Sequence, residues 1–135
     1  MAKLDPDLTV RQRAANRCEY CRISQRLQGA IFHIEHIVPR TKDGTDDLEN
    51  LALACPSCNL RKSDRVEAPD PRFGTAVPLF HPRRDKWGDH FFLHEGEIQA
   101  LTAVGRATAA ALDFNHPRRL RIRQIEQRSD DRNSP

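Results

Sequence analysis

Two pairs of cysteines enclose the most reactive side chains of this sequence. Cys18–Cys21 and Cys55–Cys58 are Cys-x-x-Cys turns, and together they hold all four cysteines of the 135 residues. Between them lie Glu35 and His36, a carboxylate beside an imidazole, and Asn59 directly follows the last cysteine. These donors indicate two metal sites in one compact unit, one of sulfur ligands and one of oxygen and nitrogen ligands.

The spacing of the cysteines favours zinc. Each Cys-x-x-Cys turn, here called a knuckle, offers two thiolates to one ion, and two knuckles complete the tetrahedral set of a structural Zn²⁺ site. The alternatives are two disulfides or four unrelated thiols. The start, Met-Ala-Lys-Leu-Asp, lacks the apolar segment of a secretory signal, so we expect a cytoplasmic protein, where disulfides are disfavoured. The expected zinc ligands are Cys18, Cys21, Cys55 and Cys58.

The segment between the knuckles must fold to position the other donors. Residues 30–38 alternate well enough to predict a strand that ends at Pro39, although two extra isoleucines blur the period. Residues 50–54 predict a second strand and residues 58–63 a short helix. Glu35 and His36 are neighbours, so a regular strand would point their side chains to opposite faces. The expected order is strand, loop, strand, helix.

These residues resemble the HNH endonuclease family in its four-cysteine, zinc-bearing branch. The resemblance covers about residues 17–65. It implies an α+β protein with a small ββα-metal core, the His-Me finger, stapled by the zinc site. It also implies metal-dependent cleavage of nucleic acid, usually double-stranded DNA. The matching positions are Glu35-His36-Ile-Val-Pro39, Gly44, Asn50 and Cys55-x-x-Cys58-Asn59-x-x-Lys62.

The resemblance also implies a role for each catalytic residue. His36 matches the general base that takes a proton from the attacking water, and a neutral imidazole suits that task near pH 7. Glu35 and Asn59 match the ligands of the catalytic cation, and two oxygen donors favour Mg²⁺ or Mn²⁺ over zinc. Asn50 matches the asparagine that supports the loop and orients the base.

Three nearby side chains have two interpretations each. His33 lies on the same strand face as Glu35, so it could join the metal site, or it could be a polar residue at a strand start. Arg61 and Lys62, on the expected helix, could face the phosphate backbone or be solvated charges. We take Arg61 and Lys62 as the predicted nucleic-acid contacts.

The composition is that of a small, polar protein with a thin core. Hydrophobic residues make up 38% and charged residues 30%, so zinc should contribute much of the folding free energy. The net charge is only +3, but 18 of the 22 basic residues are arginine, whose planar fork pairs well with phosphate. No apolar run approaches the roughly 18 residues of a membrane helix. We expect DNA as the partner and no membrane. The resemblance implies that one HNH site cuts one strand, so a double-strand break would need a homodimer or two encounters.

The rest of the chain indicates additions to this core. Pro6 suits the first turn of a helix over residues 5–17. The expected division is residues 1–16 as an N-terminal helix, 17–65 as the nuclease core, 66–76 as a linker, 77–128 as an extension and 129–135 as a disordered tail.

The extension predicts a hairpin followed by two helices. Residues 77–80 and 90–93 would be strands joined through the turn region 82–88, with an apolar cluster of their own. Thr102 would cap a helix over residues 103–112, and Pro117 would start another that ends near residue 128. This last helix is rich in arginine, so it could lie along a DNA backbone or pack on the core.

Two function classes remain open. The first is an endonuclease that hydrolyses phosphodiester bonds in DNA. The second is a non-catalytic zinc module that binds nucleic acid or protein. A binding module has no need of Glu35, His36 and Asn59 together, and for this reason the sequence favours the enzyme.

Overall fold

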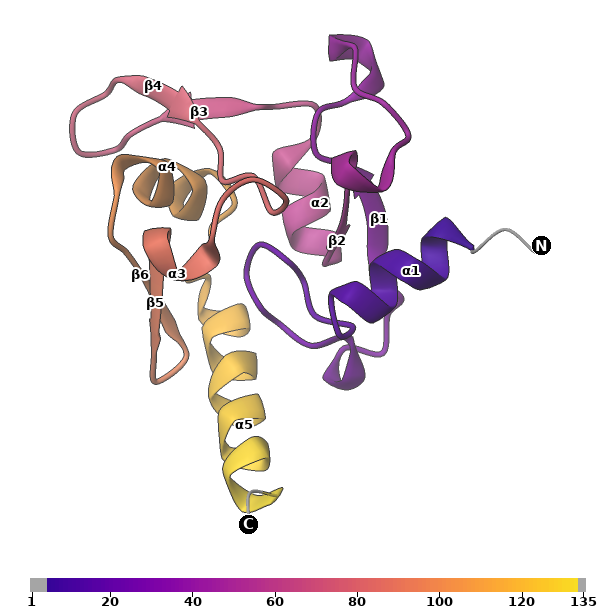
Figure 1. The fold of residues 1–135 in the computed structure, drawn as a ribbon. Helices are drawn as coiled ribbons and strands as arrows, with labels where there is room; N and C mark the ends of the chain where they lie inside the picture. The colour runs from indigo at the N-terminus through magenta and orange to yellow at the C-terminus, as the bar shows by residue number, and fades with distance from the viewer. Residues whose placement is uncertain (1–4, 134–135) are drawn as a thin grey trace.

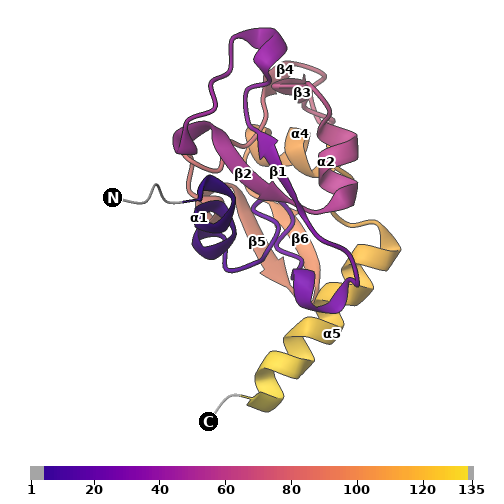
Figure 2. The ribbon, with the colours of Figure 1, turned by 90° about the vertical axis from the view of Figure 1, so that its right-hand side faces the viewer.

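The computed structural model describes residues 5–133 as an α+β fold of short helices and two-stranded sheets (Figure 1). The longest helix, α5, reaches beyond the rest of the chain at its C-terminal end (Figure 2). Within the described range every helix is too short or too polar to cross a membrane. The α-helices are α1 Pro6–Arg13, α2 Pro56–Lys62, α3 Trp87–His90, α4 Ala103–Ala111 and α5 Pro117–Asn133.

The strands pair as three antiparallel hairpins within the described residues. β1 pairs with β2, β3 with β4, and β5 with β6. Three single turns of 3-10 helix lie before and between the first two strands, at Gln25–Leu27, Arg40–Lys42 and Leu48–Asn50. The strands are β1 His33–His36, β2 Leu51–Ala54, β3 Glu67–Pro69, β4 Ala76–Pro78, β5 Phe91–His94 and β6 Glu97–Ala100.

The predicted order of strand, loop, strand and helix between the knuckles is confirmed. β1 and β2 pair from His33 opposite Ala54 to His36 opposite Leu51, and α2 follows two residues later. β1 is shorter than residues 30–38, because side chains take the backbone groups of Phe32: Arg11 donates to its carbonyl at 2.9 Å, and its amide donates to Gln25 at 2.8 Å. α2 begins with Pro56, whose missing N–H costs nothing in a first turn.

One apolar core joins the cysteines to the extension. Phe80, Phe91 and Phe114 are at most 2% exposed and pack in the same cluster as the buried cysteines. The prediction that the extension has an apolar cluster of its own, built on Trp87, Phe91 and Phe92, is therefore wrong. Trp87 and Phe91 join the common core, and Phe92 is 52% exposed.

The prediction that residues 77–80 pair with residues 90–93 is also wrong, as is the prediction that residues 66–76 form a linker. β3 lies inside the expected linker 66–76 and pairs with β4, while β5 pairs with β6. The β3–β4 hairpin packs on α4 through Ala68, Leu79 and Ala107, and this burial orders the segment. β5 and β6 are joined at Glu95 and Gly96, which both have positive φ, the conformation that a tight two-residue hairpin requires.

Among the helices outside the core, α4 and the start of α5 lie where the sequence predicts them, whereas α1 ends four residues early and α3 is not predicted. Asp5 caps α1 through its side chain, and Thr102 caps α4 as predicted. α5 begins at Pro117 but continues to Asn133, into the predicted disordered tail. Ion pairs of Asp130 with Arg17 at 3.3 Å and with Arg26 at 3.6 Å hold this part of the helix. Residues 1–4 and 134–135, which the sequence assigns to the first helix and the tail, lie outside the described range.

Candidate metal centre and active site

The four cysteines form one buried cluster, as predicted. Their Sγ atoms all lie within 4.8 Å of one another, and none of the four is in a disulfide. In each knuckle the amide of the second cysteine donates to the Sγ of the first, Cys21 to Cys18 and Cys58 to Cys55, both at 3.4 Å. Four buried sulfurs at such distances match the donor set of a tetrahedral metal site and suit zinc.

The electrostatics of the cluster also fit a metal ion. Burial raises the pKa of the Cys18 and Cys58 thiols well above the ordinary value. Thiolates at these two positions therefore require a nearby positive charge. A divalent cation among the sulfurs supplies such a charge, so the cysteine side chains present here fit a bound metal.

The oxygen and nitrogen donors meet at the surface. Glu35, His36 and Asn59 line one shallow hollow of about 320 Å³, which is open to solvent. β1 contributes the first two residues, and the first turns of α2 contribute Asn59. Glu35 and His36 border the same hollow despite their adjacent positions on β1, and Pro39, three residues further along the chain, lines it too. The structure thus brings together the three residues that the sequence singled out.

Glu35 is the buried member of this group, with 6% exposure. The hydroxyl of Tyr20 donates to its Oε1, and the Nζ of Lys62 lies 3.3 Å from its Oε2. Burial raises the pKa of the Glu35 carboxyl, while the positive charge of Lys62 acts in the opposite direction. A cation bound from the hollow would share this carboxylate with the Lys62 ammonium.

His36 is the partly exposed member. Its Nε2 lies 2.7 Å from Oδ1 of Asp46, in the loop between β1 and β2. Arg40 donates to the same oxygen through Nε at 3.0 Å. Asp46 therefore fixes the imidazole from one side, and Arg40 fixes Asp46.

Asn50 closes the loop that follows β1. Its Nδ2 donates to Val38 O at 2.9 Å and Thr45 O at 2.7 Å, and its Oδ1 accepts from Val38 N at 2.9 Å. These contacts are what the predicted supporting role requires. Gly44 is needed in the same loop, because a Cβ there would lie 1.7 Å from Val38 O.

The predicted nucleic-acid contacts fare differently. Lys62 is 1% exposed and donates to Ile37 O at 2.8 Å, so its ammonium faces the interior, and the prediction that it contacts phosphate is wrong. Arg61 is exposed and lies 3.5 Å from Asp113, so its contact with nucleic acid stays a prediction. His33 is exposed and is not among the residues that line the hollow.

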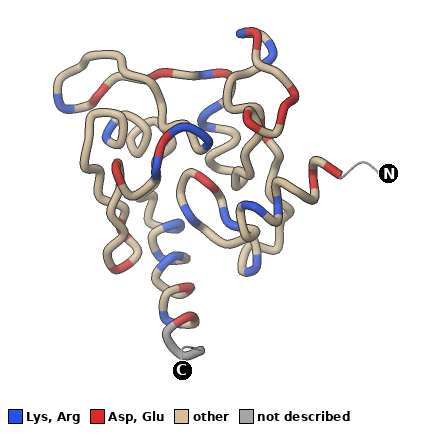
Figure 3. Tube along the Cα trace, in the orientation of Figure 1, with Lys and Arg blue, Asp and Glu red and all other residues tan. Residues whose placement is uncertain are grey.

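The arginine-rich helix α5 packs on the core with part of its basic side chains. Arg119 and Arg123 are 5% and 3% exposed, so these two cannot track a DNA backbone. Lys and Arg are interspersed with Asp and Glu over the trace, α5 included (Figure 3). The sequence did not indicate the inward role of these arginines, nor Tyr20 and Asp46 as the partners of Glu35 and His36. The spacing of residues 119, 123 and 126 does place them on one helix face, but their charge favours a surface interpretation.

Comparison with known proteins agrees with this geometry. A family model described as HNH endonuclease matches residues 18–65. The match spans both knuckles, the β1–β2 hairpin and α2, and it ends before the extension. No curated protein and no solved structure matches the chain. Residues 18–65, with their clustered cysteines, therefore match the HNH endonuclease family, and the resemblance seen in the sequence is confirmed.

Proposed function

We propose that the protein is a metal-dependent endonuclease that hydrolyses phosphodiester bonds in DNA. The observation that carries the proposal is the hollow in which Glu35, His36 and Asn59 meet at the surface of the HNH domain. A protein that only binds its partner has no use for a base and two oxygen ligands around one solvent-open site. DNA is the proposed substrate because members of the HNH family act on nucleic acid.

His36 is the proposed general base. The neutral imidazole donates from Nε2 to Asp46, 2.7 Å away, and its Nδ1 then carries the lone pair that accepts a proton from water. Asp46 keeps the ring in this orientation, and Arg40 holds Asp46 in place. Base catalysis of this kind accelerates reactions by about 10²–10⁴-fold.

Glu35 and Asn59 are the residues that would hold Mg²⁺ or Mn²⁺. One carboxylate and one amide oxygen suit a hard divalent ion that keeps several waters. When bound, such an ion stabilises negative charge on the leaving 3′-oxygen. The ammonium of Lys62 favours the ionised form of the buried Glu35 carboxyl, the form that a cation requires. In the cysteine cluster we propose Zn²⁺ with a structural role.

A plasmid-nicking experiment tests the activity. We expect the purified protein to nick supercoiled plasmid only with added Mg²⁺ or Mn²⁺, leaving 5′-phosphate and 3′-hydroxyl ends. His36→Ala should slow nicking by about 10²–10⁴-fold at saturating metal. His33→Ala is the matched control, because that histidine lies on the same strand but outside the hollow, and it should nick like the parent.

The opposite outcome is equally clear. A His36→Ala protein that nicks at the parent rate, purified in the same way, would remove His36 from the mechanism. A parent protein that binds DNA in a salt-dependent manner but nicks with neither cation would favour the zinc module that binds without cutting.

One observation favours that second candidate. Both oxygens of Glu35 already have partners, Tyr20 and Lys62, so the carboxylate is balanced without a metal ion. A Mn²⁺ titration followed by electron paramagnetic resonance distinguishes the two candidates. The endonuclease binds Mn²⁺ more weakly after Glu35→Ala or Asn59→Ala, whereas the binding module shows no Mn²⁺ site that depends on these residues.

A further inference from the structure

Helix α5 lies against both zinc knuckles, although it is outside the matched HNH segment. Three of its buried side chains, Arg119, Arg123 and Glu126, follow one another at helical spacing and face inward. Each of them bonds to a knuckle or to the residues beside it. These contacts therefore come from a helix that contributes no residue to the hollow.

Arg119 reaches a sulfur of the cysteine cluster. Its Nη1 lies 3.3 Å from Sγ of Cys58. Its Nη2 donates to the carbonyls of Leu112 and Asp113, which end α4, so the guanidinium is fixed on both sides. The side chain is 5% exposed, and therefore water does not replace these partners.

Arg123 holds the backbone of the other knuckle. Its Nη1 donates to Cys21 O at 3.4 Å, and its Nε donates to Gly96 O at 2.7 Å. Its Nη2 donates to Phe114 O at 2.6 Å. The guanidinium thus connects the first knuckle to the β5–β6 turn and to the end of the segment before α5.

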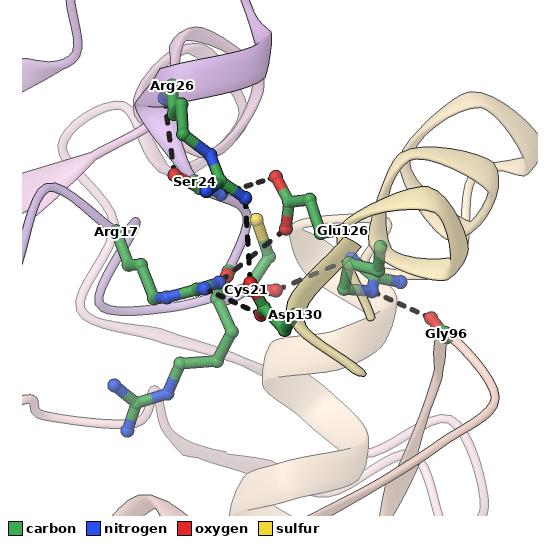
Figure 4. Close-up of polar contacts among 9 residues, drawn as sticks. Arg17, Cys21, Ser24, Arg26, Gly96, Glu126 and Asp130 are labelled. Atoms are coloured by element: carbon green, nitrogen blue, oxygen red, sulfur yellow. Dashed lines mark hydrogen bonds and ion pairs between the residues drawn. The ribbon is translucent and has the colours of Figure 1, made fainter. Parts of the chain in front are cut away.

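Glu126 completes the contact one turn further along the helix. Its Oε1 accepts from the amide of Ser24 at 2.8 Å, and its Oε2 lies 3.6 Å from Arg17 (Figure 4). Arg17 also pairs with Asp130 (Figure 4). The residues on either side of the Cys18–Cys21 knuckle are therefore both bonded to α5.

The charges explain why arginines occupy this buried face. Four thiolates around one Zn²⁺ carry a net charge of −2, which a buried site must balance. Arg119 and Arg123 bring two positive charges to the cluster, one bonded to a sulfur and one to a knuckle carbonyl. Polar partners of metal ligands commonly change metal affinity by about 10–100-fold.

We propose that Arg119 belongs to the zinc site as a positioning residue, and that zinc binding and the docking of α5 stabilise each other. The inference rests on the proposed occupancy of the cluster by zinc. Because the coupling is reciprocal, loss of Arg119 weakens zinc binding, and loss of zinc loosens α5.

The first experiment compares three full-length variants in zinc competition with a chromogenic chelator. Arg119→Met removes the charge and the sulfur contact, and we expect zinc affinity to fall by about 10–100-fold. Arg119→Lys keeps the positive charge but loses the planar guanidinium, so its zinc affinity should lie between those of the parent and of Arg119→Met. Arg121→Met, an exposed position on the same helix, is the control and should bind zinc like the parent.

A spectroscopic signature separates the sulfur contact from a purely structural role. With Co²⁺ in place of Zn²⁺, the sulfur-to-metal charge-transfer band reports the electron-donating strength of the thiolates. A hydrogen bond to Sγ weakens that donation, so Arg119→Met should move the band to longer wavelength. A residue that only packs the helix leaves the band in place.

Hydrogen exchange on the parent protein tests the reverse direction and needs no variant. Chelation of zinc should raise amide exchange in residues 119–126 of α5, because those amides are protected only while the helix is docked. If Arg119→Met fails to fold, this measurement and the Arg119→Lys titration decide the matter.

The outcomes keep the two proposals apart. Freshly purified parent protein without zinc overturns the zinc site itself. The coupling is overturned, and the zinc site stands, if the parent holds stoichiometric zinc and one of two results follows. Either folded Arg119→Met binds zinc with the parent affinity, or amide exchange in α5 does not change on chelation.

Discussion

The two donor sites of the HNH domain differ most in their access to solvent. All four cysteines are at most 3% exposed, whereas His36 keeps 27% of its side chain exposed at the rim of an open hollow. Closed tetrahedral donor sets serve structure, and open ones leave room for a substrate. Cys58 and Asn59 are neighbours on α2, yet one faces the cluster and the other the hollow. A single helix thus positions both sites and separates their roles.

This comparison predicts that damage to the closed site is the most severe. Cys58→Ser should lose zinc and folded structure together, because thiolate binding of the metal is coupled to folding. Metal analysis and circular dichroism check this. Ser57→Ala, at the exposed neighbouring position, is the control and should keep both. A Cys58→Ser protein with parent zinc content and helical signal would contradict the structural role of the cluster.

Lys62 pairs with the buried carboxylate of Glu35, and its loss should be the next largest effect. Lys62→Met leaves the buried Glu35 carboxylate without its cation, and breaking such a pair costs about 3–5 kcal/mol of stability. Urea denaturation measures the loss, with the exposed Lys86→Met as control. The double variant Glu35→Gln/Lys62→Met should recover part of it. A single variant as stable as the parent would show that the pair contributes nothing.

Asn50 sharpens the comparison, because it supports only the open site. Asn50→Ala leaves Val38 N and the carbonyls of Val38 and Thr45 without this partner, which should cost about 1–3 kcal/mol. Nicking should weaken while zinc stays bound, as plasmid assay and metal analysis would show. Asn50→Asp keeps an acceptor for Val38 N but sets a carboxylate oxygen against the carbonyls of Val38 and Thr45, so it should be no milder than Asn50→Ala. Zinc loss in Asn50→Ala would mean that the two sites are not separable.

The smallest effect is expected far from both sites. Arg106 donates to Asp70 at 2.8 and 3.0 Å, and these hydrogen bonds hold the pKa of Asp70 below its ordinary value. A carboxyl with a lowered folded pKa adds stability above its ordinary pKa of about 3.9 and loses it as the pH falls through the folded value. Asp70→Asn should lower Tm near neutral pH, and the gap to the parent should close in acid.

Thermal melts from pH 7 downward check this pH dependence. The same variant should retain parent zinc content and nicking rate, because Asp70 lies in the β3–β4 hairpin, away from the cysteines and the hollow. A gap in Tm that stays constant down to strongly acidic pH would show that the ionised carboxylate is not what stabilises the hairpin.

The HNH segment was the predictable part of this molecule. Its cysteines and its oxygen and nitrogen donors lie in short local patterns, and the strands and helix of the segment follow from alternation and from proline. The identities of Glu35, His36 and Asn59 therefore led to the hollow where they meet. Their partners could not be predicted in this way, because Tyr20 and Asp46 carry no pattern of their own.

The extension was less predictable because its contacts are distant in sequence. Arg119 and Cys58 are 61 positions apart, and no local period connects them. Short apolar runs such as residues 77–80 can pair with a strand on either side, and packing on α4 selects the earlier one. Lysine and arginine usually lie on solvent-exposed faces, so residue type alone predicts a surface contact for Lys62. Its burial and its pairing with Glu35 depend on tertiary packing.

The bond between Ser24 and Glu126 sets an order of events during synthesis. The two residues are 102 positions apart, so at about 5–20 residues per second the glutamate is added to the chain roughly 5–20 s after the serine. Until then the amide of Ser24 and the carbonyl of Cys21 lack their α5 partners. All four cysteines can leave the ribosome well before this, but the first knuckle reaches its final surroundings only after residue 126 has been added.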